Sequence, residues 1–143
     1  MRSKLLYQET EKTFALVFDE GDLFMENLLS FAKQEGLTAA HFTALGAFSD
    51  LKLGYFVPQE KWYRPIEINE QVEVIALVGD IALYEGEPFI HAHAVVGKAD
   101  GTAHGGHLVE GHVRPTLEVV LTESPRHLQR QYNPEVGLPL ISL

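Results

Sequence analysis

Residues 72–121 read VEVIALVGDIALYEGEPFIHAHAVVGKADGTAHGGHLVEGHVRPTLEVVL, and this stretch contains the strongest strand pattern of the chain. Its apolar runs at 72–78, 89–97 and 117–121 have the length and the β-branched content of strands. Asp100-Gly101, after the second run, is a dipeptide typical of hairpin turns. The stretch therefore predicts successive antiparallel strands, with Gly79-Asp80 as a break after the first.

The preceding residues predict one helix and more strands. Short apolar segments at 5–7 and 13–18 indicate strands, and 42–48 and 51–57 indicate two more, separated by a turn at Ser49-Asp50. Between them, apolar residues recur at helical spacing before Gly36, which is suited to a left-handed helix end. We therefore expect an α+β domain, a mostly antiparallel sheet packed with one main helix. The residues expected on the buried helix face are Leu23, Phe24, Leu28, Phe31 and Ala32, and the acidic residues expected at its start are Asp19, Glu20 and Asp22.

The length of 143 residues suits a single domain, 1–143. The tail at 124–143 ends in an apolar segment interrupted by prolines. Because prolines are tolerated at sheet edges, we expect Leu138, Leu140 and Ile141 to dock as an edge segment.

Composition excludes several kinds of chemistry. With no cysteine, the chain has no disulfides, thiolate zinc sites, iron–sulfur clusters or cysteine nucleophile. Twenty acidic and eleven basic residues give a net charge of −9, which disfavours a broad phosphate-binding surface. The first residues do not resemble a secretory signal, and no apolar run is long enough to span a membrane. We therefore expect a cytoplasmic protein with no membrane partner.

Histidines carry the chemical signal, because five of the seven fall between residues 91 and 112. His91 and His93 lie two apart in a predicted strand, so their side chains share one face. Neutral imidazoles on one face suit zinc, copper, nickel or iron. Three of them would leave an open coordination position, as in catalytic zinc sites. No motif identifies a catalytic residue.

The third ligand depends on strand register. A two-residue turn at Asp100-Gly101 places His93 opposite Leu108 and His91 opposite Glu110, with His112 nearby. A bulge at Gly105-Gly106 shifts the register by one residue and places His93 opposite His107. Two ligand sets therefore remain open: His91, His93 and Glu110, with or without His112, or His91, His93 and His107. Glu110 and Glu118 are candidates for a base or for a group that orients a ligand.

The sequence resembles the plants and prokaryotes conserved domain, called PPC or PCC. The resemblance is carried by Gly46, Leu53-Gly54-Tyr55, the PFIHAH segment at 88–93 and Gly105-Gly106-His107-Leu108. It implies an α+β fold, a homotrimer and a metal held by His91, His93 and His107. Plant relatives join the domain to AT-hook DNA-binding motifs, whose Arg-Gly-Arg core does not occur in this sequence.

Three functional hypotheses follow. The first is a soluble homotrimeric protein that holds a divalent transition metal, zinc above all, and binds or transforms a small ligand there. The second, from the family association, is a DNA-binding or transcription-associated regulator. The third is an oligomeric interaction module without catalysis.

Overall fold

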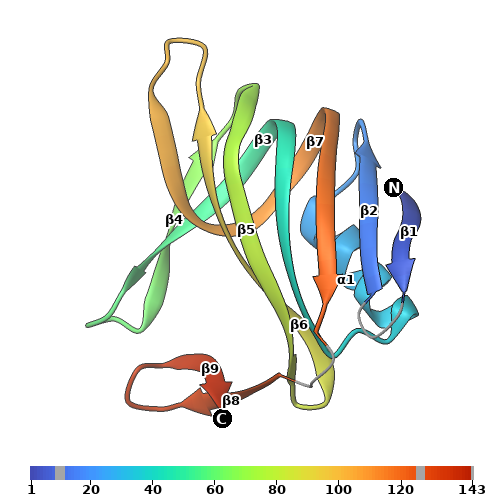
Figure 1. Cartoon of the computed structure of the whole chain (residues 1–143). Coiled ribbons are helices and arrows are strands. Elements are labelled where there is room, and N and C mark those ends of the chain that lie inside the picture. The colour runs from blue at the N-terminus through green and yellow to red at the C-terminus, as the bar shows by residue number, and fades with distance from the viewer. Residues whose placement is uncertain (9–11, 125–127, 143) are drawn as a thin grey trace.

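The computed structural model describes residues 1–8, 12–124 and 128–142. Within these ranges one helix and nine strands occur, and the strands form one sheet (Figure 1). The elements are β1 (Arg2–Gln8), β2 (Lys12–Asp19), α1 (Phe24–Glu35), β3 (Ala39–Val57), β4 (Trp62–Ile68), β5 (Val72–Tyr84), β6 (Glu87–Gly97), β7 (Ala103–Glu123), β8 (Gln129–Asn133) and β9 (Leu138–Ser142).

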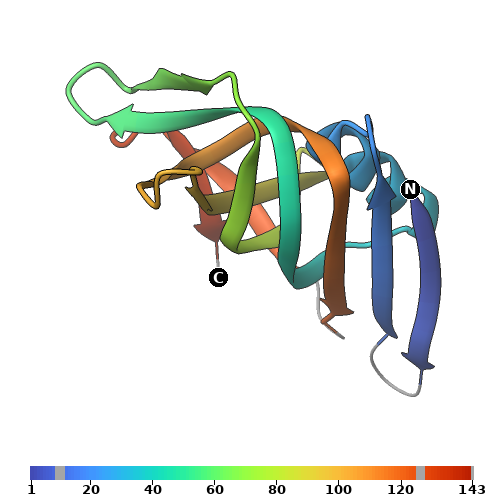
Figure 2. The ribbon, with the colours of Figure 1, turned by 90° about the horizontal axis from the view of Figure 1, so that it is seen from above.

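The sheet is almost entirely antiparallel and closes partly on itself. Its main strand order is β1-β2-β7-β3-β5-β8-β9, and β6 pairs with both β5 and β7. Strands β3, β5, β6 and β7 therefore form a closed ring of pairings. The hairpin of β3 and β4 extends away from the rest of the sheet (Figure 2). This arrangement confirms the predicted α+β class with a mostly antiparallel sheet and one main helix.

Strand β6 shows how alternation in the sequence sets the two faces of the sheet. Ile90, Ala92, Ala94 and Val96 are buried, and the intervening side chains point to the other face. Successive strand residues point to opposite faces, so burying the aliphatic set places the two histidines of this strand on the outer face together.

Helix α1 packs on the sheet through the predicted apolar face. Phe24, Leu28 and Ala32 are fully buried. The Phe24 ring meets those of Phe18 and Phe42 edge-on at 5.1 and 6.3 Å. Burying one such side chain contributes roughly 1.5–3 kcal/mol. The helix ends at Gly36, which has the expected left-handed conformation, φ 65°.

Two predicted interruptions of the sheet are wrong. Ser49-Asp50 is not a turn, because β3 passes through it with a local register shift against β7. Gly79-Asp80 is not a break, because β5 continues to Tyr84. A Cβ atom at Gly79 would lie 2.3 Å from Cζ of Phe42, so glycine here allows close ring packing rather than a chain reversal.

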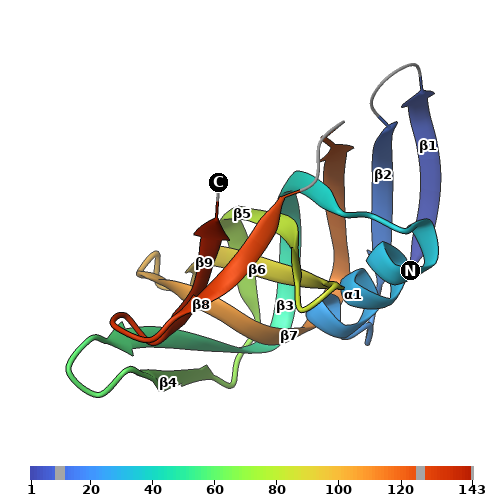
Figure 3. The same cartoon turned by 90° about the horizontal axis from the view of Figure 1, so that it is seen from below.

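The C-terminal residues form a hairpin of β8 and β9, and residues 125–127 and 143 of the predicted tail lie outside the described residues. Strand β8 runs parallel to the end of β5, where Leu83 pairs with Gln129 and Tyr84 with Arg130. The hairpin lies at the opposite end of the sheet from β1 and β2 (Figure 3). In the described part of the chain, no helix is long and apolar enough to cross a membrane.

Candidate metal centre

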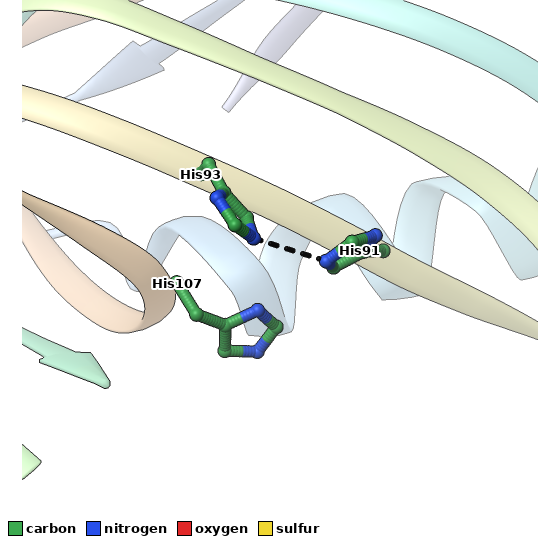
Figure 4. A group of neighbouring side chains, drawn as sticks. All are labelled: His91, His93 and His107. Carbon is green, nitrogen blue, oxygen red and sulfur yellow. Dashed lines mark hydrogen bonds between the residues drawn. The ribbon is translucent and has the colours of Figure 1, made fainter. Parts of the chain in front are cut away.

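Three imidazoles converge on the outer face of the sheet. His91 and His93 project from β6, and His107 projects from β7 directly opposite His93 (Figure 4). The Nε2 atoms of His91 and His93 are 3.2 Å apart. One ring nitrogen from each of the three residues lies within 4.8 Å of the other two. Of the two predicted ligand sets, the structure brings this one together.

The register that places His107 here has a different cause from the predicted bulge. No shift interrupts the pairing of β6 with β7, and Gly97 lies opposite Ala103. The loop is longer than two residues, since Lys98 N donates to Thr102 O and Gly101 N donates to Lys98 O. Gly101 has φ 82°, as in a type I turn followed by a glycine bulge. The extra residue therefore lies in the turn and not at Gly105-Gly106.

Gly106, the second glycine of the pair, has another role, which is to let β3 approach β7. A Cβ atom on Gly106 would lie 2.9 Å from the carbonyl oxygen of Gly54. Strand β3 pairs Gly54 with His107, so this close approach brings the β3–β4 hairpin against the histidine. Tyr63 of that hairpin covers the imidazole, with ring centroids 4.6 Å apart.

The environment keeps two imidazoles neutral. Burial lowers the pKa of His107 to about 4, assisted by the positive charge that His91 and His93 carry when protonated. Burial also lowers the pKa of His93, again assisted by His91. Metal ligation requires an unprotonated imidazole nitrogen, so both residues are ready to bind a cation at neutral pH.

The donor set fits a transition metal. The Nδ1 atom of His107 is buried without a hydrogen-bond partner among the described residues. Buried polar atoms are usually satisfied, and an imidazole nitrogen beside two others would be satisfied by a metal ion. His91, His93 and His107 are therefore the residues that could hold one.

An ion pair between Asp80 and Arg130, which the sequence did not predict, lies next to Nδ1 of His91. Asp80 of β5 is opposite His91, with Oδ2 3.7 Å from Nδ1 of the imidazole. The other carboxylate oxygen accepts a 2.6 Å hydrogen bond from Arg130 of β8. Burial alone would raise the pKa of Asp80, but its interactions with His91 and Arg130 lower it below the usual 3.8. Asp80 is therefore a carboxylate at neutral pH.

A cavity of about 500 Å³ adjoins the histidines. It is open on one side and is lined by His93, His107, aromatic side chains of the β3–β4 hairpin and aliphatic side chains of β5 and β6. Apart from the two imidazoles, its lining contains no charged side chain: no Asp, Glu, Lys or Arg of the described chain contributes to it. A small molecule with an apolar body therefore has room beside the imidazoles.

Glu110 does not join the cluster but caps helix α1. Its Oε1 accepts from the backbone N–H of Met25 at 2.8 Å, and its Oε2 accepts from that of Glu26 at 3.1 Å. Leu23, at the helix start, provides no side-chain cap. We expected Asp19, Glu20 and Asp22 to place negative charge at the helix start. In the structure it is Glu110, on a strand distant in sequence, whose carboxylate accepts from the first-turn N–H groups. Such a charge is favourable at the positive end of the helix dipole.

Replacing Glu110 by alanine should lower the free energy of unfolding by about 1–2 kcal/mol, because two helix N–H groups lose their acceptor. Glu110→Gln, which keeps one acceptor oxygen, should lose less. Urea denaturation measures both changes. Both variants should contain as much zinc as the wild type. A variant that loses zinc but keeps its stability would instead indicate that Glu110 is a metal ligand.

His112 is bound elsewhere, in a small polar cluster. Its Nδ1 donates to Oδ1 of Asp50 at 2.8 Å, and the hydroxyl of Ser49 donates to the other carboxylate oxygen at 2.8 Å. The predicted turn is therefore absent. The strand β3 instead shifts its register against β7 at this point, and these hydrogen bonds stabilise the irregular segment. The hydrogen bond from His112 is the main cause of the lowered pKa of Asp50, helped by Ser49 and opposed by burial. Neither His112, nor Glu118, which pairs with Val17 and Leu45, belongs to the cluster.

The Asp50 contact should give a small dependence of stability on pH. Because its folded-state pKa is lowered below 3.8, its contribution is present above the unfolded pKa and lost as pH falls through the folded value. Asp50→Asn should therefore be less stable than the wild type at pH 7 by about 0.2–1 kcal/mol, since the pair is largely exposed. The difference should shrink as the pH falls below 3.8 and disappear once Asp50 is protonated in the folded state as well. Urea denaturation across pH 2.5–7 tests this, and a difference constant over that range would contradict it.

Fold and site together define a class: small α+β proteins whose sheet presents three clustered histidines on its outer face. The model of the Plants and Prokaryotes Conserved (PCC) domain matches residues 6–125. The chain therefore belongs to this family. No curated protein matches the sequence.

Solved structures with the same fold cover almost the whole chain. A plant- and prokaryote-conserved protein from Pyrococcus horikoshii is 32% identical, with a TM-score of 0.86 over 99% of this chain and 95% of its own. A protein from Archaeoglobus fulgidus described as metal-containing is 28% identical, with a TM-score of 0.86 over 100% of this chain and 99% of its own. A candidate DNA-binding protein from Bacteroides thetaiotaomicron is 25% identical, with a TM-score of 0.88 over 98% and 96%.

Proposed function

We propose that this protein binds a divalent transition metal, zinc, through His91, His93 and His107. The observation that carries the proposal is the convergence of three ring nitrogens within 4.8 Å. In addition, one nitrogen of His107 is buried and has no hydrogen-bond partner in the described part of the chain. The metal-containing relative from Archaeoglobus fulgidus supports it. Three imidazoles suit zinc, and an ion held by these residues would supply Lewis-acid chemistry at the site.

The chain's own residues prepare this site in three ways. Burial, together with the charges that His91 and His93 carry when protonated, lowers the pKa of His107, and the Tyr63 ring covers its imidazole. Asp80 lies on the side of His91 opposite its contact with His93, which suits orientation of a ligating imidazole. The adjoining cavity, without charged walls, is where we expect a small molecule to bind.

Metal analysis of protein purified without a histidine tag tests the proposal. We expect one zinc per chain by mass spectrometry, and anomalous scattering at the zinc edge between the three rings. A protein that holds no stoichiometric metal, and takes up none when zinc is supplied, would overturn it.

We further propose that the protein forms a homotrimer through the outer face of the sheet. Leu45, Val78 and Val120 are 64%, 54% and 52% exposed there. Val78 pairs with His93, so this apolar surface is continuous with the histidines. Large exposed apolar patches mark association sites.

Light scattering should give three times the chain mass of 16.0 kDa. The double variant Leu45→Lys/Val120→Lys should be monomeric, because it places charge on that surface. A wild-type protein that is monomeric at micromolar concentration would contradict this assignment.

DNA binding is the second candidate function, and the candidate DNA-binding relative from Bacteroides thetaiotaomicron is what favours it. A phosphate interface loses affinity steeply with salt. Titration of duplex DNA at two salt concentrations tests it. With a net charge of −9, we expect no binding at physiological salt.

A further inference from the structure

Arg130 is the buried cation of the C-terminal hairpin. Its side chain is only 6% exposed, and its Nη2 atom is 2.6 Å from Oδ1 of Asp80. Its Nη1 atom donates to the carbonyl oxygen of Pro139 on the neighbouring β9 at 3.0 Å. One guanidinium therefore joins both strands of the hairpin to a carboxylate in the main sheet.

That carboxylate lies behind the histidine cluster. The Nδ1 atom of His91 is 3.7 Å from Oδ2 of Asp80 and 3.5 Å from Nη2 of Arg130. The opposite nitrogen of the same ring, Nε2, faces His93. Asp80 and Arg130 thus contact one edge of the His91 imidazole while its other edge is free for the cluster.

The other contacts that attach the hairpin to the described chain are few. Strand β8 pairs with β5 at two positions, and Leu128 exchanges backbone hydrogen bonds with Leu83 and Thr38 at 2.7 and 3.4 Å. The Nζ atom of Lys61, in the β3–β4 turn, donates to the carbonyl oxygen of Pro134. A buried ion pair that loses one partner leaves an uncompensated charge, which is strongly unfavourable. Among these contacts, the Arg130–Asp80 pair is the one made by a buried cation, so it contributes to hairpin docking together with the backbone bonds.

We propose that Arg130 is a positioning residue for the metal centre, and that metal binding and docking of the β8–β9 hairpin are energetically coupled. The inference rests on the proposed function. It adds that docking of the β8–β9 hairpin regulates the affinity of that site for its metal. Arg130 fixes Asp80, and the pair fixes the orientation of His91. Residues that orient a ligating histidine in this way typically contribute 10–100-fold to metal affinity. Coupling is reciprocal. The free energy by which a docked hairpin strengthens metal binding therefore equals the free energy by which a bound metal favours docking of the hairpin.

The first test compares zinc affinity, by competition with a chelator, in Arg130→Gln and in Arg64→Gln. Arg64 is the matched control because its side chain is 67% exposed and lies on β4. We expect Arg130→Gln to bind zinc about 10–100-fold more weakly and Arg64→Gln to match the wild type. Asp80→Asn, which keeps the shape of the carboxylate, should reproduce the loss and serves if Arg130→Gln fails to fold.

The second test is hydrogen exchange of residues 129–142 with and without zinc. In the wild type, zinc should slow exchange across the hairpin, and in Arg130→Gln it should not. A merely structural arginine would leave this response to zinc unchanged.

The outcomes separate the two proposals. If the wild type binds zinc but hydrogen exchange of its hairpin is the same with and without zinc, the coupling is overturned, whatever the affinity of the variants. Equal affinity in Arg130→Gln and wild type would overturn the positioning role. A wild type that binds no zinc would overturn the metal centre itself, and this inference with it.

Discussion

Replacing His91 and His93 together by alanine should abolish stoichiometric zinc binding. The variant keeps only His107, and a protein zinc site gains about 3 kcal/mol from each ligand if its total binding energy is shared equally. Losing two ligands therefore lowers affinity on the order of 10⁴-fold. Metal content after dialysis and a competition titration measure the change.

The matched control is His41→Ala/His104→Ala, which removes two histidines outside the cluster. It should keep the metal content of the wild type. Both double variants should remain folded, since His91 and His93 lie on the outer face of β6 and not in its core. Equal loss of metal in the two variants would show non-specific binding to histidine and would refute the site.

Replacing Gly46 by alanine should cause the largest loss of stability, about 3–5 kcal/mol from backbone strain and overpacking combined. Gly46 has φ +146°, and a Cβ atom there would lie 2.3 Å from the carbonyl oxygen of Thr116. The obstructing atoms include the backbone of β7, which cannot rotate away as a side chain can. Urea denaturation measures the loss.

Gly86→Ala is the control, because Gly86 also has positive φ but no atom within 4 Å of the added Cβ. It should cost about 1 kcal/mol, the conformational penalty alone. If the two substitutions cost the same, the close approach of β3 to β7 at Gly46 is not what requires glycine.

The sequence predicted the elements whose pattern is local. The alternation of aliphatic residues in β6 and the helical spacing from Phe24 to Ala32 correspond to the faces that are buried. The pairing of His93 with His107 was one of the predicted registers, but its cause was wrong. Asp100-Gly101 permits more than one turn, and only the backbone conformation distinguishes a two-residue turn from the longer loop observed.

The wrong predictions share a physical reason, which is that pairing with neighbouring strands overrides local turn preference. Gly79 pairs with Phe42 of β3 and Ala92 of β6, so β5 is held straight where the dipeptide favours a break. Asp50 pairs with His112 of β7, which likewise holds β3 extended. The ion pair of Asp80 with Arg130 was missed because its members are 50 residues apart in sequence, and no periodicity links them.

The β6–β7 hairpin that holds the three imidazoles has a consequence for the unfolded chain. All three lie within residues 91–107, and closing so short a loop costs little conformational entropy. We therefore expect the denatured protein to keep some affinity for zinc. Ligand stabilises a fold only by the difference between its affinities for the folded and unfolded chains. Zinc should accordingly raise the melting temperature less than its affinity for the native protein suggests.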